Sequence, residues 1–427
     1  MNRQSQTRSI GLDSILLLAL VVPFIMNYPL IVEGTSYLLF SLIFVTFLLY
    51  IVVDLWPLSE KAYRFAKIGL LSLAILLVLG SAFRAAIIRR HQVSPVFEVH
   101  DMPIQIELGL QYLVNGKNPY TENYIGTPLE EWHFDDTATN PAVYHFVMGP
   151  FYLLMSIPFY VASNRLFGYF DARMPLYLLY GSLMLMAGVL VKDLRKKLLF
   201  IMLIGFSPAV LNYVLEGRTD VAMHAFLFLG WFLLYKNNGV LAGISLALAF
   251  ALKQSAWPLF PLYAIWLYLQ APAKQHSASK IIQTLIKLLP FTITFTAVML
   301  PFYLWDPQSF MEDTISYLSG TIPTSYPISG YGLGMLLHEL GFITDRMAYY
   351  PFIIWQILIV LPTLFFLGRY IRKKPTVKRM IVSYGILLFI YWYLSRYFNN
   401  SHLGYISLVF VTAYFWPEHE KTDRPEI

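Results

Sequence analysis

The sequence contains no cysteine, which excludes disulfide bonds, thiolate metal sites and cysteine nucleophiles. It also has little charge: 13% of its 427 residues are Asp, Glu, Lys or Arg, whereas 57% are apolar. A soluble globule needs more polar surface than this, so the composition predicts an integral membrane protein. No basic stripe is interleaved with stacking aromatic residues, so we expect no binding to nucleic acid.

Aromatic residues are abundant at 17%, which is typical of a protein with aromatic belts at both membrane surfaces. Apolar runs long enough to cross a bilayer recur along the chain. The candidate spans are 10–30, 35–55, 67–88, 174–191, 198–214, 220–235, 239–252, 255–270, 281–304, 351–371, 379–395 and 402–416. We therefore expect a single transmembrane domain, residues 1–427, folded as an all-α polytopic helical bundle of about a dozen spans.

Short clusters of Lys and Arg separate alternate spans, for example at 61–67, 192–197, 274–280 and 372–379. Because basic loops stay in the cytoplasm, these clusters place both termini inside. The orientation holds only if the apolar stretch 141–162 does not cross. Pro141, Pro150 and Pro158 each remove a backbone donor there, so an interfacial helix or broken hairpin is expected. The predicted location is a plasma membrane, such as a bacterial inner membrane, with the polar chemistry facing the periplasm or exterior.

This topology leaves two long loops outside the membrane, residues 89–173 and 305–350. Long loops without repeats are often functional. The first is where we expect the chemistry of the protein, together with a juxtamembrane helix. The second is rich in Pro, Gly, Ser and Tyr, which indicates a lid or a clamp over a substrate.

Polar residues gather in the outer loops and turns, which the topology brings to one level of the membrane. They include Asp101 in the first loop, Arg218 and Asp220 in one turn, Lys253 in the next, and the run from Arg396 to His402 in the last. Cations bind phosphate and a carboxylate removes a proton, so this set suits a lipid-linked anionic substrate.

The order of these features resembles the GT-C superfamily, integral membrane glycosyltransferases that use polyprenyl-phosphate sugars, and is nearest to its bacterial mannosyltransferase-like branch. The similarity covers residues 95–270, and a weaker similarity is present at residues 395–402. It departs in two places: three spans precede the catalytic loop, and Gly217-Arg218 stands where the family has Gly-Gln. The matching residues are Asp101, then Gly116, Asn118, Pro119 and Tyr120, then Asn140, Pro141 and Tyr144, then Arg173, Gly217 with Asp220, and Lys253.

The resemblance implies a GT-C fold and an inverting transfer of a mannose-like hexose or pentose from polyprenyl phosphate to a glycan, lipid or protein acceptor outside the cytoplasm. Asp101 matches the family's catalytic base. The expected phosphate-binding residues are Lys253, Arg396, Arg218 and Arg173. The expected substrate-binding residues are His100, Tyr120, Asn140, Tyr144, Asp220, Tyr397 and His402. The implied partners are the lipid-linked donor, the acceptor and membrane lipids, without a cofactor.

Structural roles compete with several of these assignments. Asp101 could serve only as the N-cap of the helix that follows, and Gly116 to Tyr120 could be a helix stop. Lys253 could extend to the interface without a ligand, and Arg218 with Asp220 could be an ion pair between two spans. His402 could be an interfacial histidine.

Two further alternatives concern the chemistry and the class of protein. Glu130, Glu131, His133, Asp135 and Asp136 could bind a divalent metal, although acids in a solvated loop usually bind none. A secondary transporter also has about a dozen spans, but it should show internal repeats and ionisable residues at mid-membrane, and no clear repeat is present. A polymerase or ligase of lipid-linked glycans shares the substrate and remains an alternative.

Overall fold

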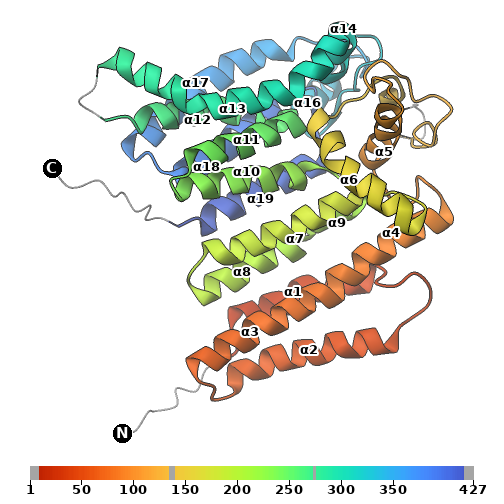
Figure 1. Ribbon diagram of the computed structural model, residues 1–427, viewed down its shortest axis with the longest axis vertical. Coiled ribbons are helices and arrows are strands. Elements are labelled where there is room, and N and C mark those ends of the chain that lie inside the picture. Colours follow the sequence, from red (N-terminus) through yellow and green to blue (C-terminus); the bar gives the residue numbers. More distant parts are fainter. Residues whose placement is uncertain (1–8, 134–139, 273–275, 418–427) are drawn as a thin grey trace.

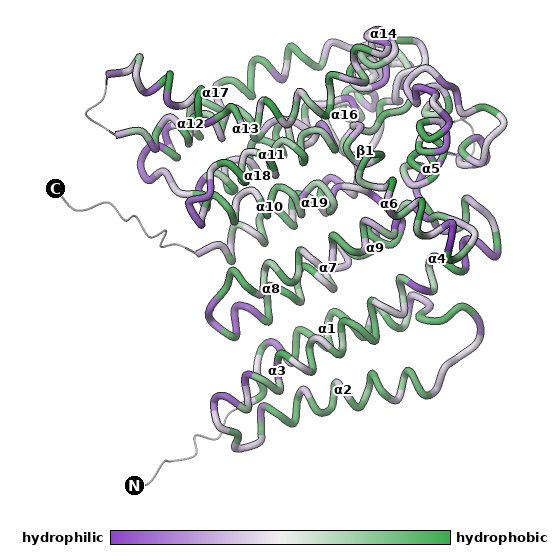
Figure 2. Tube along the Cα trace, in the orientation of Figure 1, coloured by the Kyte–Doolittle hydropathy of each residue, from purple (hydrophilic) through white to green (hydrophobic). Residues whose placement is uncertain are grey.

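The computed structural model describes residues 9–133, 140–272 and 276–417. Most helices run side by side between two ends of a bundle, and the polar residues gather at those ends (Figures 1 and 2). A helix satisfies all of its backbone donors and acceptors internally, which is why long apolar segments adopt it in lipid.

The first half of the chain contributes one long helix built from three pieces. It begins as α3 (Glu60–Ile75), passes through a π-helical turn (Leu76–Gly80) and continues as α4 (Ser81–Val93). The other helices of this half are α1 (Leu12–Asn27), α2 (Tyr37–Leu55), α5 (Asp101–Val114), α6 (Pro150–Phe167), α7 (Arg173–Leu190), α8 (Leu194–Phe206), α9 (Pro208–Glu216) and α10 (Asp220–Tyr235), with a 3₁₀ turn at Pro141–Tyr144.

In the described part of the second half, β1 (Ser329–Gly330) pairs in parallel with β2 (Tyr397–Phe398), with two residues in each strand. Short turns are Gln254–Ala256 (3₁₀) and Glu312–Ser316 (π). The helices are α11 (Gly239–Leu252), α12 (Leu259–Leu269), α13 (Ser277–Trp305), α14 (Pro307–Met311), α15 (Tyr317–Ser319), α16 (Leu333–Glu339), α17 (Phe352–Lys373), α18 (Val377–Tyr393) and α19 (Asn400–Phe415).

The prediction of a helical membrane protein is confirmed. Among the described residues, five helices are long and apolar enough to cross a membrane: α2, α3 with α4, α7, α13 and α17. The pair α8 and α9, bent by 44° at Ser207, makes a sixth if it is one span. Shorter apolar helices are α1, α10, α11 and α12. Every predicted span falls on a helix, and the number of twelve crossings stays a prediction.

Two helices near one end of the bundle differ from the rest. α6 covers the stretch that we excluded from the spans, and it runs across the direction of the neighbouring helices (Figure 1). Its first residue is Pro150, which suits a helix start because that position needs no N–H. α5 lies at the same end and carries Asp101 as its first residue. Both helices lie in the first long loop, where we expect a juxtamembrane helix, and their position relative to a membrane stays a prediction.

Candidate functional site

Most of the predicted site residues line one cavity of about 680 Å³, into which the N-terminus of α5 projects. The rest of its wall is largely aromatic and apolar and comes from α12, α17, α18 and the loop after α14. The predicted residues that line it are His100, Asp101, Arg218, Asp220, Lys253, Arg396, Tyr397 and His402.

Asp101 begins α5, but the residue that caps this helix is His100, whose Nδ1 accepts a hydrogen bond from the Met102 N–H at 3.3 Å. The carboxylate of Asp101 has side-chain partners instead. Its Oδ1 lies 2.5 Å from His100 Nδ1, and its Oδ2 accepts from Asn140 Nδ2 at 3.0 Å. Burial opposes ionisation, yet His100, the Asn140 amide and the Arg218 charge together lower the pKa of Asp101. The group is therefore a carboxylate at neutral pH.

Lys253 and Asp220 form an ion pair in the cavity wall. Lys253 directly follows α11 and its Nζ donates to Asp220 Oδ2 at 2.8 Å. Asp220 Oδ1 is buried and accepts no hydrogen bond from any residue that the structure describes. The ammonium of Lys253 is thus held by a carboxylate, so an anionic ligand would share it with Asp220.

Arg218 follows Gly217, the left-handed residue that ends α9. A side chain at Gly217 would collide with Pro103, so the turn requires glycine. Arg218 Nε donates to Glu216 Oε2 at 3.1 Å and Nη1 donates to Ser401 Oγ at 3.0 Å. Because the Glu216 side chain is 41% exposed, water screens this pair. Arg218 therefore keeps much of its attraction for an anion, and its carboxylate partner is not Asp220.

Arg396 is buried and its guanidinium is directed to the second long loop. Nη1 donates to the Ala348 carbonyl at 2.8 Å, and Nη2 donates to the carbonyls of Arg346 at 3.0 Å and Met347 at 2.9 Å. Nε donates to the carbonyl of Tyr326. Burial lowers the pKa of Arg396 to about 10. Its principal contacts organise the loop, and its charge still contributes to the potential of the cavity.

The loop also wraps around the residues that follow Arg396. The β1–β2 pairing joins it to 397–398, and Asn399 Nδ2 donates to the hydroxyl of Tyr326 at 3.2 Å. The ring of Tyr326 lies 4.7 Å from that of Tyr397, centroid to centroid. His402 Nδ1 accepts from the Asn399 N–H at 2.9 Å, so this histidine also takes part in the cap of α19.

The structure places Arg173 in a buried ionic cluster outside the cavity. Its Nε and Nη2 donate to Asp171 at 2.9 and 2.8 Å, and its Nη1 and Nη2 donate to the carbonyls of Leu215 and Ala86 at 3.1 and 3.0 Å. Each of its three guanidinium nitrogens donates to the protein, and the side chain is fully buried. Arg173 therefore joins helices, and the geometry gives it no access to a substrate in the cavity.

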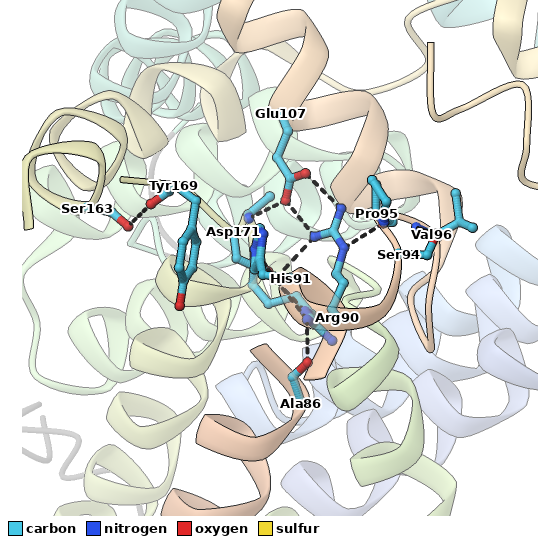
Figure 3. Close-up of polar contacts among 12 residues, drawn as sticks. Ala86, Arg90, His91, Ser94, Pro95, Val96, Glu107, Ser163, Tyr169 and Asp171 are labelled. Atoms are coloured by element: carbon cyan, nitrogen blue, oxygen red, sulfur yellow. Dashed lines mark hydrogen bonds and ion pairs between the residues drawn. The ribbon is translucent and has the colours of Figure 1, made fainter. Parts of the chain in front are cut away.

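The same cluster fixes α5, as Figure 3 shows. Arg90 donates from Nη1 and Nη2 to the two carboxylate oxygens of Glu107 at 2.7 and 2.8 Å, and from Nη1 to Asp171 at 3.1 Å. Glu107 Oε1 also accepts from the Ala172 N–H at 2.8 Å. These contacts tie α5 to the end of α4 and the start of α7, and so hold the helix that carries Asp101.

The remaining predicted residues have structural positions around the cavity. Tyr120 is buried, donates to the carbonyl of Met148 at 2.8 Å and packs edge-on against Phe146. Tyr144 is 46% exposed and does not line the cavity. Gly116 has a φ of 75° directly after the end of α5, as the helix-stop alternative predicts. Asn140 reaches the site through its bond to Asp101.

One contact that joins the two long loops could not be predicted from the sequence. His145 Nδ1 lies 2.7 Å from Asp313 Oδ1, and His145 Nε2 lies 2.6 Å from Thr324 Oγ1. Asp313 Oδ2 accepts from the Phe146 N–H at 2.7 Å. Burial raises the pKa of Asp313 to about 6. More than 160 residues separate these partners in the sequence, so no local pattern marks them.

Gln105 is a second residue that sequence reasoning missed. Its Nε2 donates to the carbonyls of Ala142 at 3.1 Å and His145 at 2.5 Å, and its Oε1 accepts from the Val147 N–H at 3.2 Å. Gln105 lies one helical turn after Asp101 and also lines the cavity. The available signal was its spacing, because a polar residue four positions after Asp101 lies on the same side of the helix.

A metal site was the weaker alternative for the acids of the first loop. Asp135 and Asp136 lie outside the described residues. Within the ranges that the structure covers, no group of three or more His, Cys, Asp or Glu side chains is arranged to hold a metal ion.

Comparison with known proteins gives no relative on which to base an assignment: no model of a known protein family matches the chain, and no curated protein matches it either. The function must therefore be argued from the cavity and its residues.

Proposed function

We propose that the chain is an inverting glycosyltransferase that moves a sugar from a polyprenyl phosphate to an acceptor hydroxyl. The observation that carries this proposal is the cavity itself. It joins an ionised carboxylate, Asp101, to two cations, Arg218 and Lys253, beside apolar walls from α12 and α17. A base, an anion site and a surface for a lipid are the three parts that this transfer needs.

In the proposed reaction Asp101 takes the proton of the acceptor hydroxyl as its oxygen bonds to the anomeric carbon. The bond from that carbon to the phosphate oxygen breaks at the same time, and the electron pair leaves with polyprenyl phosphate. Arg218 and Lys253 stabilise the charge that develops on the leaving oxygen. A phosphate is a good leaving group, so no second carboxyl group is needed as an acid.

Contacts around Asp101 support its role. Asn140 and His100 hold the carboxylate by two side-chain contacts, and Gln105 fixes the segment that carries Asn140 to α5. Asp220, Tyr397 and His402 line the same cavity and suit the hydroxyl groups and ring of a sugar. The transfer would take place at the membrane surface, in a bacterial inner membrane facing the periplasm.

The test is incubation of the purified protein in lipid with a panel of radiolabelled polyprenyl-phosphate sugars and candidate acceptors. Loss of label from the lipid, with inversion at the anomeric carbon, is the expected result. Absence of turnover with every donor would reject the transferase. Uptake of sugars or ions into proteoliposomes would then test the alternative of a secondary transporter.

A further inference from the structure

A separate hollow of about 380 Å³ lies at the end of the bundle opposite the polar cavity. It is lined by the later half of α12, the first turns of α13 and the last turns of α17, and α12 packs against both of the other helices (Figure 1). Only apolar atoms face its interior. The hydroxyl of Thr284, for example, donates within its own helix to the Lys280 carbonyl at 2.8 Å. The hollow therefore suits a hydrocarbon chain.

The hollow is short. On α13 its lining residues run from Ile281 to Leu288, a distance of about 10 Å at the rise of an α-helix. One leaflet of a bilayer has a hydrocarbon depth of about 15 Å, half of the ~30 Å core. The hollow therefore matches much of one acyl chain of a phospholipid in the nearer leaflet.

Cations surround the same end of the bundle and form what we call the basic rim. Its members are Lys280, Arg369, Arg372, Lys373, Lys374, Lys378 and Arg379. Arg372 lies in the last turn of α17 and also lines the hollow. Because only apolar atoms face the interior, Arg372 contributes its stem there and its guanidinium lies at the edge. The Lys280 ammonium lies 5.9 Å from the centroid of the Tyr268 ring, which lines the hollow too.

The helices that carry and adjoin the basic rim have no acid to neutralise it. Neither α12, α13, α17 and α18 nor the turns that join them in pairs, 270–276 and 374–376, contain Asp or Glu. The basic clusters at 61–67 and 192–197 differ, because Glu60 directly precedes the first and Asp193 lies within the second. The basic rim is therefore the place on this side where a positive potential adjoins a hollow for a hydrocarbon chain.

We propose that the hollow and the basic rim bind one anionic phospholipid, with an acyl chain in the hollow and the phosphate beside Arg372 and Lys373. Basic pockets between transmembrane helices on the cytoplasmic side, where we predict this end to lie, bind anionic headgroups. An arginine can hold a phosphate with two parallel hydrogen bonds, so Arg372 fixes the headgroup. The site is separate from the polar cavity and does not depend on the proposed reaction. A lipid held there would join α13 and α17 across α12.

The test uses the full chain in phosphatidylcholine nanodiscs with a trace of phosphatidylglycerol that carries a photoreactive group in one acyl chain. This probe should label the segments 264–269 and 281–288. Unlabelled phosphatidylglycerol should compete with it at least tenfold better than added phosphatidylcholine, and inorganic phosphate should not compete. In the double variant Arg372→Gln, Lys373→Gln, competition by phosphatidylglycerol should weaken by about 25-fold, at about fivefold for each cation removed.

A matched double variant, Arg195→Gln with Lys196→Gln, removes the same charge from the cluster at 192–197, outside the hollow. It should bind the probe as the wild type does. An equal loss in both double variants would show attraction to the whole surface and would reject the site. Equal competition by the two lipids, or competition by inorganic phosphate, would reject it as well.

Gly368→Leu tests the hollow itself. A Cβ at this position would lie 3.5 Å from Ile265 Cδ1, so a larger side chain enters the space for the acyl chain. Labelling of 264–269 and 281–288 should fall in this variant, whereas Gly368→Ala should keep it. Full labelling in a Gly368→Leu protein that melts like the wild type would place the lipid elsewhere and reject the proposal.

Discussion

Replacement of Asp101 by asparagine is the sharpest test of the proposed mechanism. Asparagine has nearly the same shape, and its oxygen can still accept from Asn140. His100, and not Asp101, caps α5, so the helix keeps its cap. The variant loses mainly the contact between the carboxylate and His100, and we expect the free energy of unfolding to fall by no more than about 1 kcal/mol.

The effect on turnover should be much larger. An amide cannot take a proton at neutral pH, so kcat should fall by at least the ~10²-fold typical of a lost general base. Donor binding depends on Arg218 and Lys253 and should stay close to that of the wild type. The assay is the initial rate of sugar transfer from a radiolabelled lipid donor, measured with donor binding and a melting temperature on the same preparation.

Glu98→Gln is the matched control. Glu98 lies three residues before Asp101, is 40% exposed, and pairs with Arg89 outside the cavity. Its loss should leave turnover nearly unchanged. Asp101→Asn transferring sugar at close to the wild-type rate would remove Asp101 from the mechanism, and with it the main reason to prefer a transferase to a transporter.

Three further predictions concern the cations and the topology. Arg218→Met and Lys253→Met should each weaken donor binding by about tenfold or more, as expected for one lost charge-assisted bond. The melting temperature should not fall by a comparable amount of stability. Unchanged donor affinity in both variants would exclude these residues from the phosphate site. Arg396→Met should instead expose the second long loop to proteolysis, because four carbonyls lose their donors; a protease-resistant loop in a stable variant would contradict this role. Arg195→Cys, in a chain without other cysteines, should resist a membrane-impermeant thiol reagent in intact cells, and labelling there would reject the topology.

The helices could be predicted because apolar runs of this length have few other solutions in lipid. α6 is not among the helices that pass as spans, but neither are α18 and α19, so the exclusion of 141–162 from the spans stays a prediction. The apolar pattern does not show which of these helices cross the membrane completely. Several are short, such as α12 with 11 residues, and their length alone does not determine whether they span the bilayer.

The partners of the charged residues were harder to predict than their positions. Arg218 and Arg396 both lie in turns that we predict to face outward, and both fit a phosphate site by sequence. In the structure Arg396 donates to loop carbonyls that are about 50 to 70 residues away in the chain. Every residue type has a backbone carbonyl, so the sequence does not show which carbonyls will accept a hydrogen bond from an arginine. The sequence therefore could not distinguish the two arginines.

Glu107 shows the same limit for the acids. By sequence it is equivalent to Glu98, a second carboxylate near Asp101, and it would be an obvious control. The structure buries it against Arg90 and the Ala172 N–H, so Glu107→Gln would leave a buried arginine with one ion pair fewer. A loss of activity in that variant would report on the position of α5 and not on proton transfer.

The charges of the whole cavity give an argument that does not depend on any single contact. Three cations, Arg218, Lys253 and Arg396, and two carboxylates, Asp101 and Asp220, line it, so its formal charge is +1 when the histidines are neutral. A lipid-linked sugar phosphate is a phosphodiester with one negative charge, which this potential attracts. When the sugar leaves, the phosphate becomes a monoester whose charge approaches −2 at neutral pH. The transition state therefore carries more negative charge near the cations than the bound donor does, and a positive cavity stabilises it more strongly than the ground state, which is the condition for catalysis.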